Sequence, residues 1–86
     1  MRTLETLIRV QRRQLDQLRR ELVGLEQLAV DLRQQAADLE REVVQQQALA
    51  RSTPEGAFAY PGYARQVIAR REKVAASIVD VDARLV

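Results

Sequence analysis

One stretch decides the fold: residues 2–51 read RTLETLIRVQRRQLDQLRRELVGLEQLAVDLRQQAADLEREVVQQQALAR. This stretch holds no proline and a single glycine, Gly24, and most of its residues favour helix. Its apolar residues recur alternately three and four positions apart, which is the heptad spacing of a coiled coil. The stretch therefore predicts one helix over 2–51, on the order of 75 Å long, which is too long for a compact globule of 86 residues.

The heptad repeat keeps one phase along this helix. Its a positions are Met1, Ile8, Leu15, Leu22, Ala29, Ala36, Val43 and Ala50, and its d positions are Leu4, Gln11, Leu18, Leu25, Leu32, Leu39 and Gln46. An unbroken phase of this length predicts an apolar seam along one side of the helix that packs on another helix.

Residues 52–62 interrupt the pattern and are expected to form a turn. The sequence STPE at 52–55 combines capping residues with a first-turn proline and the acidic residue of a capping box. Tyr60-Pro61-Gly62 is a second break. The second helix therefore begins near Thr53 with a kink at Pro61, or begins only at Pro61, and the pattern leaves both starts open. We take the second helix as about 63–86.

The second helix is expected to fold back on the first as an antiparallel hairpin. Its periodic residues face the seam in the pairs Ala50/Ala64, Gln46/Val67, Val43/Arg71, Leu39/Val74, Ala36/Ile78, Leu32/Val81 and Ala29/Leu85, whose residue numbers all sum to 113 or 114. The misfit is Arg71, for which Glu42 is the expected ionic partner. The predicted fold class is all-α, a long antiparallel two-helix coiled-coil hairpin.

The hairpin leaves the first part of the long helix without a partner. Nothing in the chain lies opposite Met1–Glu26, although Ile8, Leu15, Leu18, Leu22 and Leu25 keep the heptad phase. Each large side chain left in water forfeits about 1.5 to 3 kcal/mol of burial. We therefore expect the chain to be part of a longer protein whose second helix runs back to about residue 113, and we expect the 86-residue form to self-associate through this seam.

The charges are unevenly distributed. Residues 1–20 carry +4, residues 21–50 carry −4, residues 51–73 carry +3 and the remainder carries −1. A basic end beside an acidic middle suggests that different parts of a rod face different partners, although such blocks also serve simply to solvate a helix face.

The composition argues against catalysis and against a metal or cofactor site. The chain contains no cysteine and no histidine, Lys73 is its single lysine, and carboxylates such as Glu40 and Glu42 have no expected pocket to shift their pKa. No apolar run approaches the roughly 18 residues of a membrane span. We predict a protein that is not an enzyme, that does not cross a membrane, and that resides by default in the cytoplasm.

A cluster of arginines is the first candidate binding surface. It comprises Arg9, Arg12, Arg13, Arg19 and Arg20. A basic-region zipper would place such residues before the leucines, whereas Ile8, Leu15 and Leu18 run through this cluster, and the chain has no asparagine to read adenine. We therefore expect no nucleic-acid partner; a basic collar around the seam is instead suited to an acidic protein surface.

The aromatic residues Phe58, Tyr60 and Tyr63 gather at the expected turn and form the second candidate surface. Their rings either cap the end of the hairpin or anchor a partner protein. Capping is the favoured interpretation, because a hairpin end has apolar edges at Ala50 and Ala64 to cover.

Several segments together resemble the flagellar export protein FliJ family. They are Leu4-Glu5-Thr6-Leu7-Ile8-Arg9-Val10, the long Leu/Gln/Glu/Arg helix, the turn with Ser52, Phe58-Ala59-Tyr60 and Tyr63, and then Ile68 and Arg70-Arg71-Glu72. The resemblance implies a cytoplasmic antiparallel coiled coil at the inner-membrane base of the flagellum, similar in shape to the stalk of rotary ATPases. It implies three partners: a hexameric export ATPase, the cytoplasmic region of the export gate, and export chaperones. On this resemblance Arg9, Arg12 and Arg13 lie at the ring-facing end and Phe58, Tyr60 and Tyr63 at the opposite tip.

Overall fold

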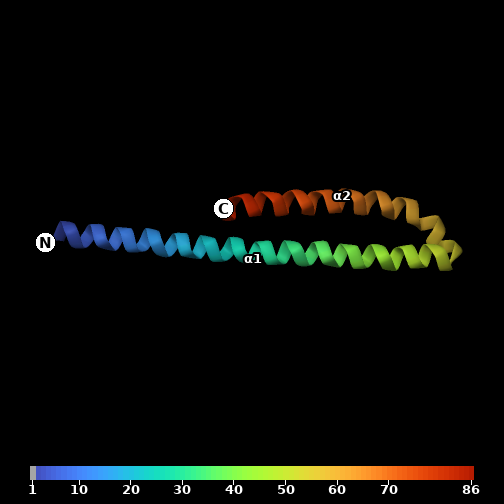
Figure 1. Ribbon diagram of the computed structural model, residues 1–86, viewed down its shortest axis with the longest axis horizontal. Helices are drawn as coiled ribbons and strands as arrows, with labels where there is room; N and C mark the ends of the chain where they lie inside the picture. Colours follow the sequence, from blue (N-terminus) through green and yellow to red (C-terminus); the bar gives the residue numbers. More distant parts are fainter. Residues whose placement is uncertain (1) are drawn as a thin grey trace.

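The computed structural model describes residues 2–86, which form two helices, α1 (Arg2–Ser52) and α2 (Pro54–Leu85). Met1, the first expected seam residue, lies outside the described residues. The helices run antiparallel, and α2 ends about halfway back along α1 (Figure 1). The molecule measures 79 × 17 × 15 Å. The predicted all-α hairpin is therefore confirmed.

The length of α1 follows from local chemistry. Glu5 in its first turn and Arg51 in its last turn both complement the helix dipole. Side-chain amides support the exposed face at i,i+4 spacing, as where Gln27 donates to Asp31 at 2.9 Å. Within residues 2–86, neither helix combines the length and the apolar content that crossing a membrane requires.

A single residue, Thr53, links the two helices. Its backbone is extended, with φ −135° and ψ 144°, which ends α1. Its Oγ1 donates to the carbonyl of Leu49 at 3.0 Å and accepts from the backbone N–H of Gly56 at 2.9 Å, so one hydroxyl joins the end of α1 to the start of α2. Pro54 then occupies the first turn of α2, where its missing N–H costs nothing.

The expected turn over 52–62 and the expected start of the second helix at 63 are therefore wrong. Of the two starts that the pattern left open, the structure takes the one near Thr53, and Pro61 lies inside α2. Figure 1 shows the first turns of α2, in gold, running at an angle to the rest of the helix. The side chain of Thr53 caps this earlier start by accepting a hydrogen bond from the backbone N–H of Gly56.

Two apolar clusters hold the helices together in the predicted register. One consists of Ala29, Leu32 and Val81, with Leu25, Ile78 and Leu85 packed against it. The other consists of Leu39, Val43 and Val67, with Tyr63 and Val74 packed against it. The expected pairs Leu32/Val81, Ala29/Leu85 and Leu39/Val74 each share a cluster, so the predicted register is confirmed where the clusters report on it.

Ion pairs on the flanks of the seam show the same register and correct one expectation. Arg71 lies half-buried on the seam as expected, but its Nη2 lies 2.6 Å from the Oε2 of Glu40. Glu42 instead pairs with Arg70 at 3.6 Å. The expected Arg71–Glu42 pair is therefore wrong by half a helical turn, because the long side chain of Arg71 carries its guanidinium to the flank of the seam on which Glu40 lies.

Candidate protein-binding surfaces

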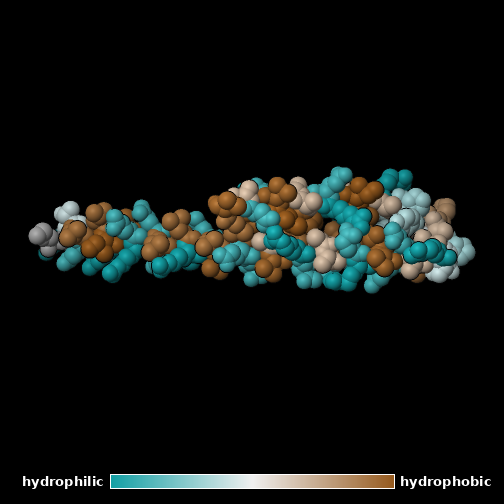
Figure 2. All heavy atoms as spheres, in the orientation of Figure 1, coloured by the Kyte–Doolittle hydropathy of each residue, from teal (hydrophilic) through white to brown (hydrophobic). Residues whose placement is uncertain are grey.

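The first half of α1 carries an uncovered apolar row, which we call the open seam: Leu4, Ile8, Gln11, Leu15, Leu18 and Leu22. Residues 2–24 are all exposed. Leu18 retains 61% of its accessible surface, whereas Leu32, at the same heptad position where α2 covers the seam, retains 8%. Figure 2 shows the corresponding brown side chains along the single helix at the left. The heptad pattern thus continues for about three heptads beyond the part of the seam that α2 covers.

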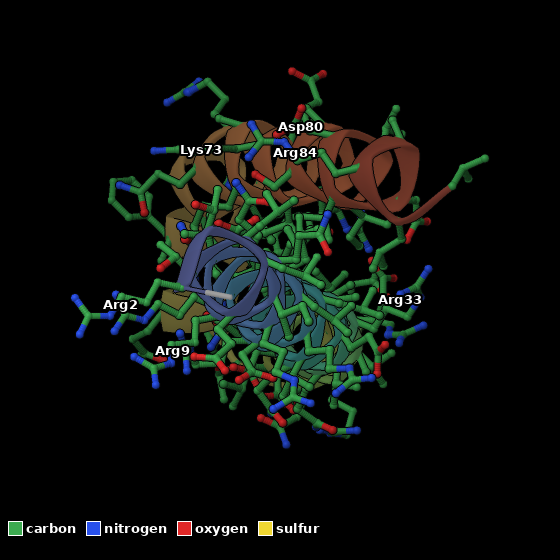
Figure 3. All side chains as sticks on the ribbon, turned by 90° about the vertical axis from the view of Figure 1, so that its left-hand side faces the viewer. Arg2, Arg9, Arg33, Lys73, Asp80 and Arg84 are labelled. Atoms are coloured by element: carbon green, nitrogen blue, oxygen red, sulfur yellow. The ribbon has the colours of Figure 1, made fainter. Side chains whose placement is uncertain are left out.

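Arginine side chains flank the open seam along one side. Arg9, Arg12 and Arg13 are all exposed on this part of α1. The arginines of residues 2–20 occupy only the b, e and f positions of the heptad. These three positions are neighbours around the helix and lie beside the a positions, Ile8 and Leu15. Figure 3 shows Arg2 and Arg9 projecting on the same side of α1. The charge is therefore one-sided, and a partner that lies on the open seam meets it along one flank.

The opposite flank of the open seam is more apolar at its start. Leu7 and Val10 are exposed there, with 52% and 43% of their surfaces accessible. The apolar surface is therefore wider near the beginning of α1 than along the rest of the open seam. Neither residue belongs to the a or d positions, so seam periodicity alone did not identify them.

The three aromatic residues do not act together. Phe58 projects into solvent with 91% of its surface accessible. Tyr63 packs against the cluster of Leu39, Val43 and Val67, and its ring lies 6.2 Å from that of Tyr60. The expectation that all three rings cap the hairpin end is therefore wrong for Phe58, because the α2 helix begins at Pro54 and turns this side chain away from α1.

The two tyrosines contact α1 in different ways, Tyr60 through a hydrogen bond and Tyr63 through apolar packing. The Tyr60 hydroxyl accepts a hydrogen bond from the side-chain amide of Gln47 at 3.4 Å. The Tyr63 hydroxyl is buried and has no hydrogen-bond partner among residues 2–86. Partial burial and the nearby negative charge of Glu42 both raise the pKa of the Tyr63 phenol. Tyr60 and Tyr63 therefore serve the packing of the tip, which leaves Phe58 as its free aromatic side chain.

The predicted site residues lie in two groups that the fold keeps apart. The arginines lie on the uncovered part of α1, near the N-terminal end of the rod, and the aromatic residues lie at the hairpin tip (Figure 1). The rod measures 79 Å along its long axis. One partner of ordinary domain size therefore cannot contact both groups at once.

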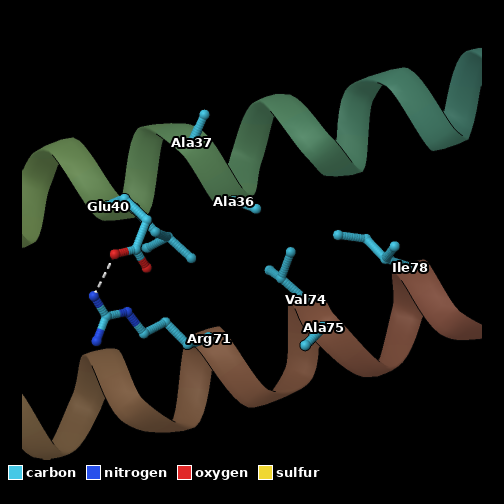
Figure 4. A pocket seen from close by; sticks show the side chains of 8 residues that line it. Ala36, Ala37, Glu40, Arg71, Val74, Ala75 and Ile78 are labelled. Atoms are coloured by element: carbon cyan, nitrogen blue, oxygen red, sulfur yellow. Dashed lines mark hydrogen bonds and ion pairs between the residues drawn. The ribbon is translucent and has the colours of Figure 1, made fainter.

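A groove between the helices is a third surface, which sequence reasoning missed. It has a volume of about 370 Å³ and is lined by Ala36, Ala37, Leu39, Glu40, Arg71, Val74, Ala75 and Ile78 (Figure 4). It exists because the side chains of Ala36, Ala37 and Ala75 are small and leave space unfilled along this side of the helix pair. The signal that points to it is the pair of adjacent alanines on α1, Ala36-Ala37, matched by Ala75-Ala76 on α2.

No protein-family model, curated protein or solved structure matches this chain. The residues and geometry described above therefore carry the functional argument.

Proposed function

We propose that this chain is a non-enzymatic coiled-coil component of the flagellar type III protein export apparatus. It acts as a stalk for the export ATPase ring, and as an escort that contacts the export gate and export chaperones. Its place of action is the cytoplasmic side of the inner membrane, at the base of the flagellum. Support comes from the segments that resemble the FliJ family and from one structural observation: α1 extends far beyond α2 as a single helix with an apolar seam and a basic flank.

The geometry suits a stalk because the two ends of the rod differ in width. The covered half is a pair of helices, whereas the uncovered half is one helix, about 10–12 Å across with its side chains. A single helix is the narrowest element that can enter the opening of a ring. Its arginines attract acidic side chains on the wall of such an opening and so increase the rate of association.

The stalk role is tested by binding to the export ATPase hexamer and to the cytoplasmic domain of the export gate. We expect the unmodified chain to bind the ATPase, and the triple variant Arg9→Glu, Arg12→Glu, Arg13→Glu to bind much more weakly. A matched control makes the same charge change on the covered half of the rod, at Arg51, Arg65 and Lys73, none of which contributes to the open seam. Equal loss in both triple variants, or no binding of the unmodified chain to either protein, would contradict the proposal.

The escort role is assigned to the tip, because Phe58 is the free aromatic side chain there. We expect Phe58→Ala to weaken capture of export chaperones while leaving ATPase binding unchanged. The exposed residue Ile68 provides the control, since Ile68→Ala removes exposed apolar surface from another part of α2. Chaperone capture that is insensitive to Phe58 would remove the tip from the proposal.

A second candidate is a cytoplasmic scaffold or adaptor of another assembly, and the groove favours it. Beside the groove, Val30 and Val44 are both exposed at the heptad position of Ala37, so a second apolar row follows one side of α1. A helix from another protein that docks along this row would be released by Val44→Glu and not by the arginine triple variant. The reverse result would favour the export role.

A further inference from the structure

The open seam ends where α2 begins to cover it, so α1 presents one continuous seam of which α2 covers the second part. Leu25 is half-buried and packs against the cluster that contains Val81. Leu22, three residues earlier, retains 46% of its surface. We propose that a second copy of this chain covers the open seam as an antiparallel, two-fold symmetric dimer centred on Gln11. This inference goes beyond the proposed function and does not rest on it.

The hairpin itself supplies the pairing rule. Residues that face one another on the seam have numbers that sum to 113 or 114, as for Leu32 with Val81, and the flanking pair Arg33 with Asp82 sums to 115. Arg33 and Asp82 are both e positions. Two e positions that face each other beside the seam therefore have residue numbers whose sum is one or two larger than the sum for a seam pair. The same rule applies when α1 pairs antiparallel with α1 of a second copy. Because the heptad repeats every seven residues, the allowed registers differ by a shift of seven residues of one copy along the other. The registers that overlap most of the open seam place Ile8, Gln11 or Leu15 on the two-fold axis.

Coverage of apolar side chains selects among these registers. With Gln11 on the axis, Leu4 faces Leu18 of the second copy and Ile8 faces Leu15, so each apolar residue between Leu4 and Leu18 meets another. With Ile8 on the axis, Leu18 would instead stay in water. Fifteen residues, 4–18, lie on each side of the Gln11-centred pair, and Leu22 lies beyond them. This number is below the roughly 20–30 residues a side of stable interfaces, which fits a weak, reversible dimer.

The position of α2 excludes the remaining arrangements. With Leu15 on the axis, Leu4 of each copy would face Leu25, which already packs against the cluster that includes Leu85. The start of each chain would then meet the end of the other copy's α2. A parallel pair would bring the two α2 helices to the same level of two adjacent seams, where each blocks the approach of the other α1 (Figure 1). The Gln11-centred register instead places α2 and the second copy's α1 on successive stretches of the seam.

The flanking charges agree with this choice. With Gln11 on the axis, Glu5 faces Arg19 of the second copy at two symmetric contacts, and Arg12 faces its own counterpart once. With Leu15 on the axis, Glu5 would face Glu26 and Arg12 would face Arg19, so that all four contacts would be between like charges. Arg12, Arg19 and Arg33 share one heptad position, and Arg33 pairs with an acidic residue where α2 covers the seam.

Gln11 gives the dimer its register. It is the single polar residue of the open seam. On the two-fold axis its side-chain amide meets the identical amide of the second copy, and each amide N–H donates to the other carbonyl oxygen. A polar residue buried at one seam position specifies register and oligomeric state, because every other register leaves it opposite an apolar side chain.

The dimer is tested first by charge exchange, with the mass of the purified chain followed by sedimentation equilibrium over the micromolar range. We expect a monomer–dimer equilibrium. Glu5→Arg and Arg19→Glu should each weaken it roughly tenfold, because each places like charges at two symmetric contacts. The double variant should restore it. In the Leu15-centred register both single changes would strengthen association, so tighter dimers of the single variants would overturn the proposal.

Cross-linking then reads the register directly. The chain has no cysteine, so single cysteines can be introduced without background. Under mild oxidation Gln11→Cys should form a disulfide-linked dimer faster than Ile8→Cys or Leu15→Cys, because side chains on the two-fold axis lie close enough to bond. Val10→Cys, beside Gln11 but off the seam, is the control. Faster linkage at Ile8, Leu15 or Val10 would overturn the Gln11-centred register.

A third result distinguishes a second copy of the chain from other molecules that could bind the open seam. A chain that stays monomeric throughout the micromolar range overturns the dimer, whether or not it then binds vesicles of anionic lipid or an acidic helical peptide. Neither experiment includes the export ATPase, so failure of the dimer leaves the proposed stalk role standing, and failure of ATPase binding leaves the dimer standing. If both hold, the second copy and the ring compete for the same seam.

Discussion

The Nη2 of Arg33 lies 2.9 Å from Oδ1 and 2.8 Å from Oδ2 of Asp82, a residue 49 positions away in the sequence. The pair bridges α1 and α2 beside the apolar cluster of Leu32 and Val81. It therefore reports the hairpin register independently of the apolar contacts.

Removing the charges of Arg33 and Asp82 tests how much this pair stabilises the hairpin. The two side chains remain 55% and 45% exposed, so water screens their attraction and we expect a coupling free energy of about 0.2–1 kcal/mol. A double-mutant cycle with Arg33→Gln and Asp82→Asn, followed by urea unfolding at one fixed protein concentration, measures it. A coupling well above this range would mean that the pair is more deeply desolvated than its exposure indicates.

Arg71→Leu is expected to stabilise the hairpin by about 1 kcal/mol, because it places an apolar side chain on the seam and removes a guanidinium whose buried Nε finds no hydrogen-bond partner in the described part of the chain. Glu40 loses its ionic partner, but its side chain is 62% exposed and water solvates it. Thermal melting measures the change. Arg70→Leu is the control, since Arg70 lies at the flank with 59% of its side chain exposed and should give no comparable gain. A lower melting temperature for Arg71→Leu would show that the ion pair outweighs the apolar contact.

Gly56→Ala and Gly62→Ala should change stability in opposite directions. A Cβ at Gly56 would lie 2.5 Å from the carbonyl oxygen of Leu49 and 2.7 Å from the Oγ1 of Thr53, so the link between the helices must shift. We expect a loss of about 1–3 kcal/mol. A Cβ at Gly62 meets nothing within 4 Å, and alanine there should add about 0.4–1 kcal/mol by restricting the unfolded chain. Urea unfolding of both variants checks the contrast, and equal effects would contradict the close approach at Gly56.

Tyr63 is expected to titrate above the ordinary tyrosine pKa of 10.0, because partial burial and the charge of Glu42 both disfavour the phenolate. A pKa raised by folding contributes stability that is present below pH 10 and is lost as the pH rises through the folded-state value. Ultraviolet titration of the Tyr60→Phe variant observes Tyr63 alone. Glu42→Gln should then lower the midpoint, and an unchanged midpoint would remove Glu42 as a cause.

Much of the binding surface follows from composition and spacing. Heptad phase predicted the open seam, and charge counting predicted a basic first part of α1, because both properties depend on which residues recur and not on how the chain turns. The expected basic collar around the seam is wrong, since the arginines lie along one flank. The free state of Phe58 and the groove beside Ala37 were not predictable in this way. Both depend on how α2 leaves the tip and how closely it lies on α1.

The sequence by itself determined the two helices, the seam that joins them and the register, because a repeated spacing of apolar residues adds the same preference at every turn. Only the tertiary structure decided where α2 begins and which carboxylate Arg71 meets. The local signals at Thr53 and Pro61 compete on similar terms, and the hydroxyl of Thr53 between Leu49 and Gly56 settles the start. Arg71 has acidic side chains within reach at both Glu40 and Glu42, so the choice depends on the side of the seam from which its stem emerges.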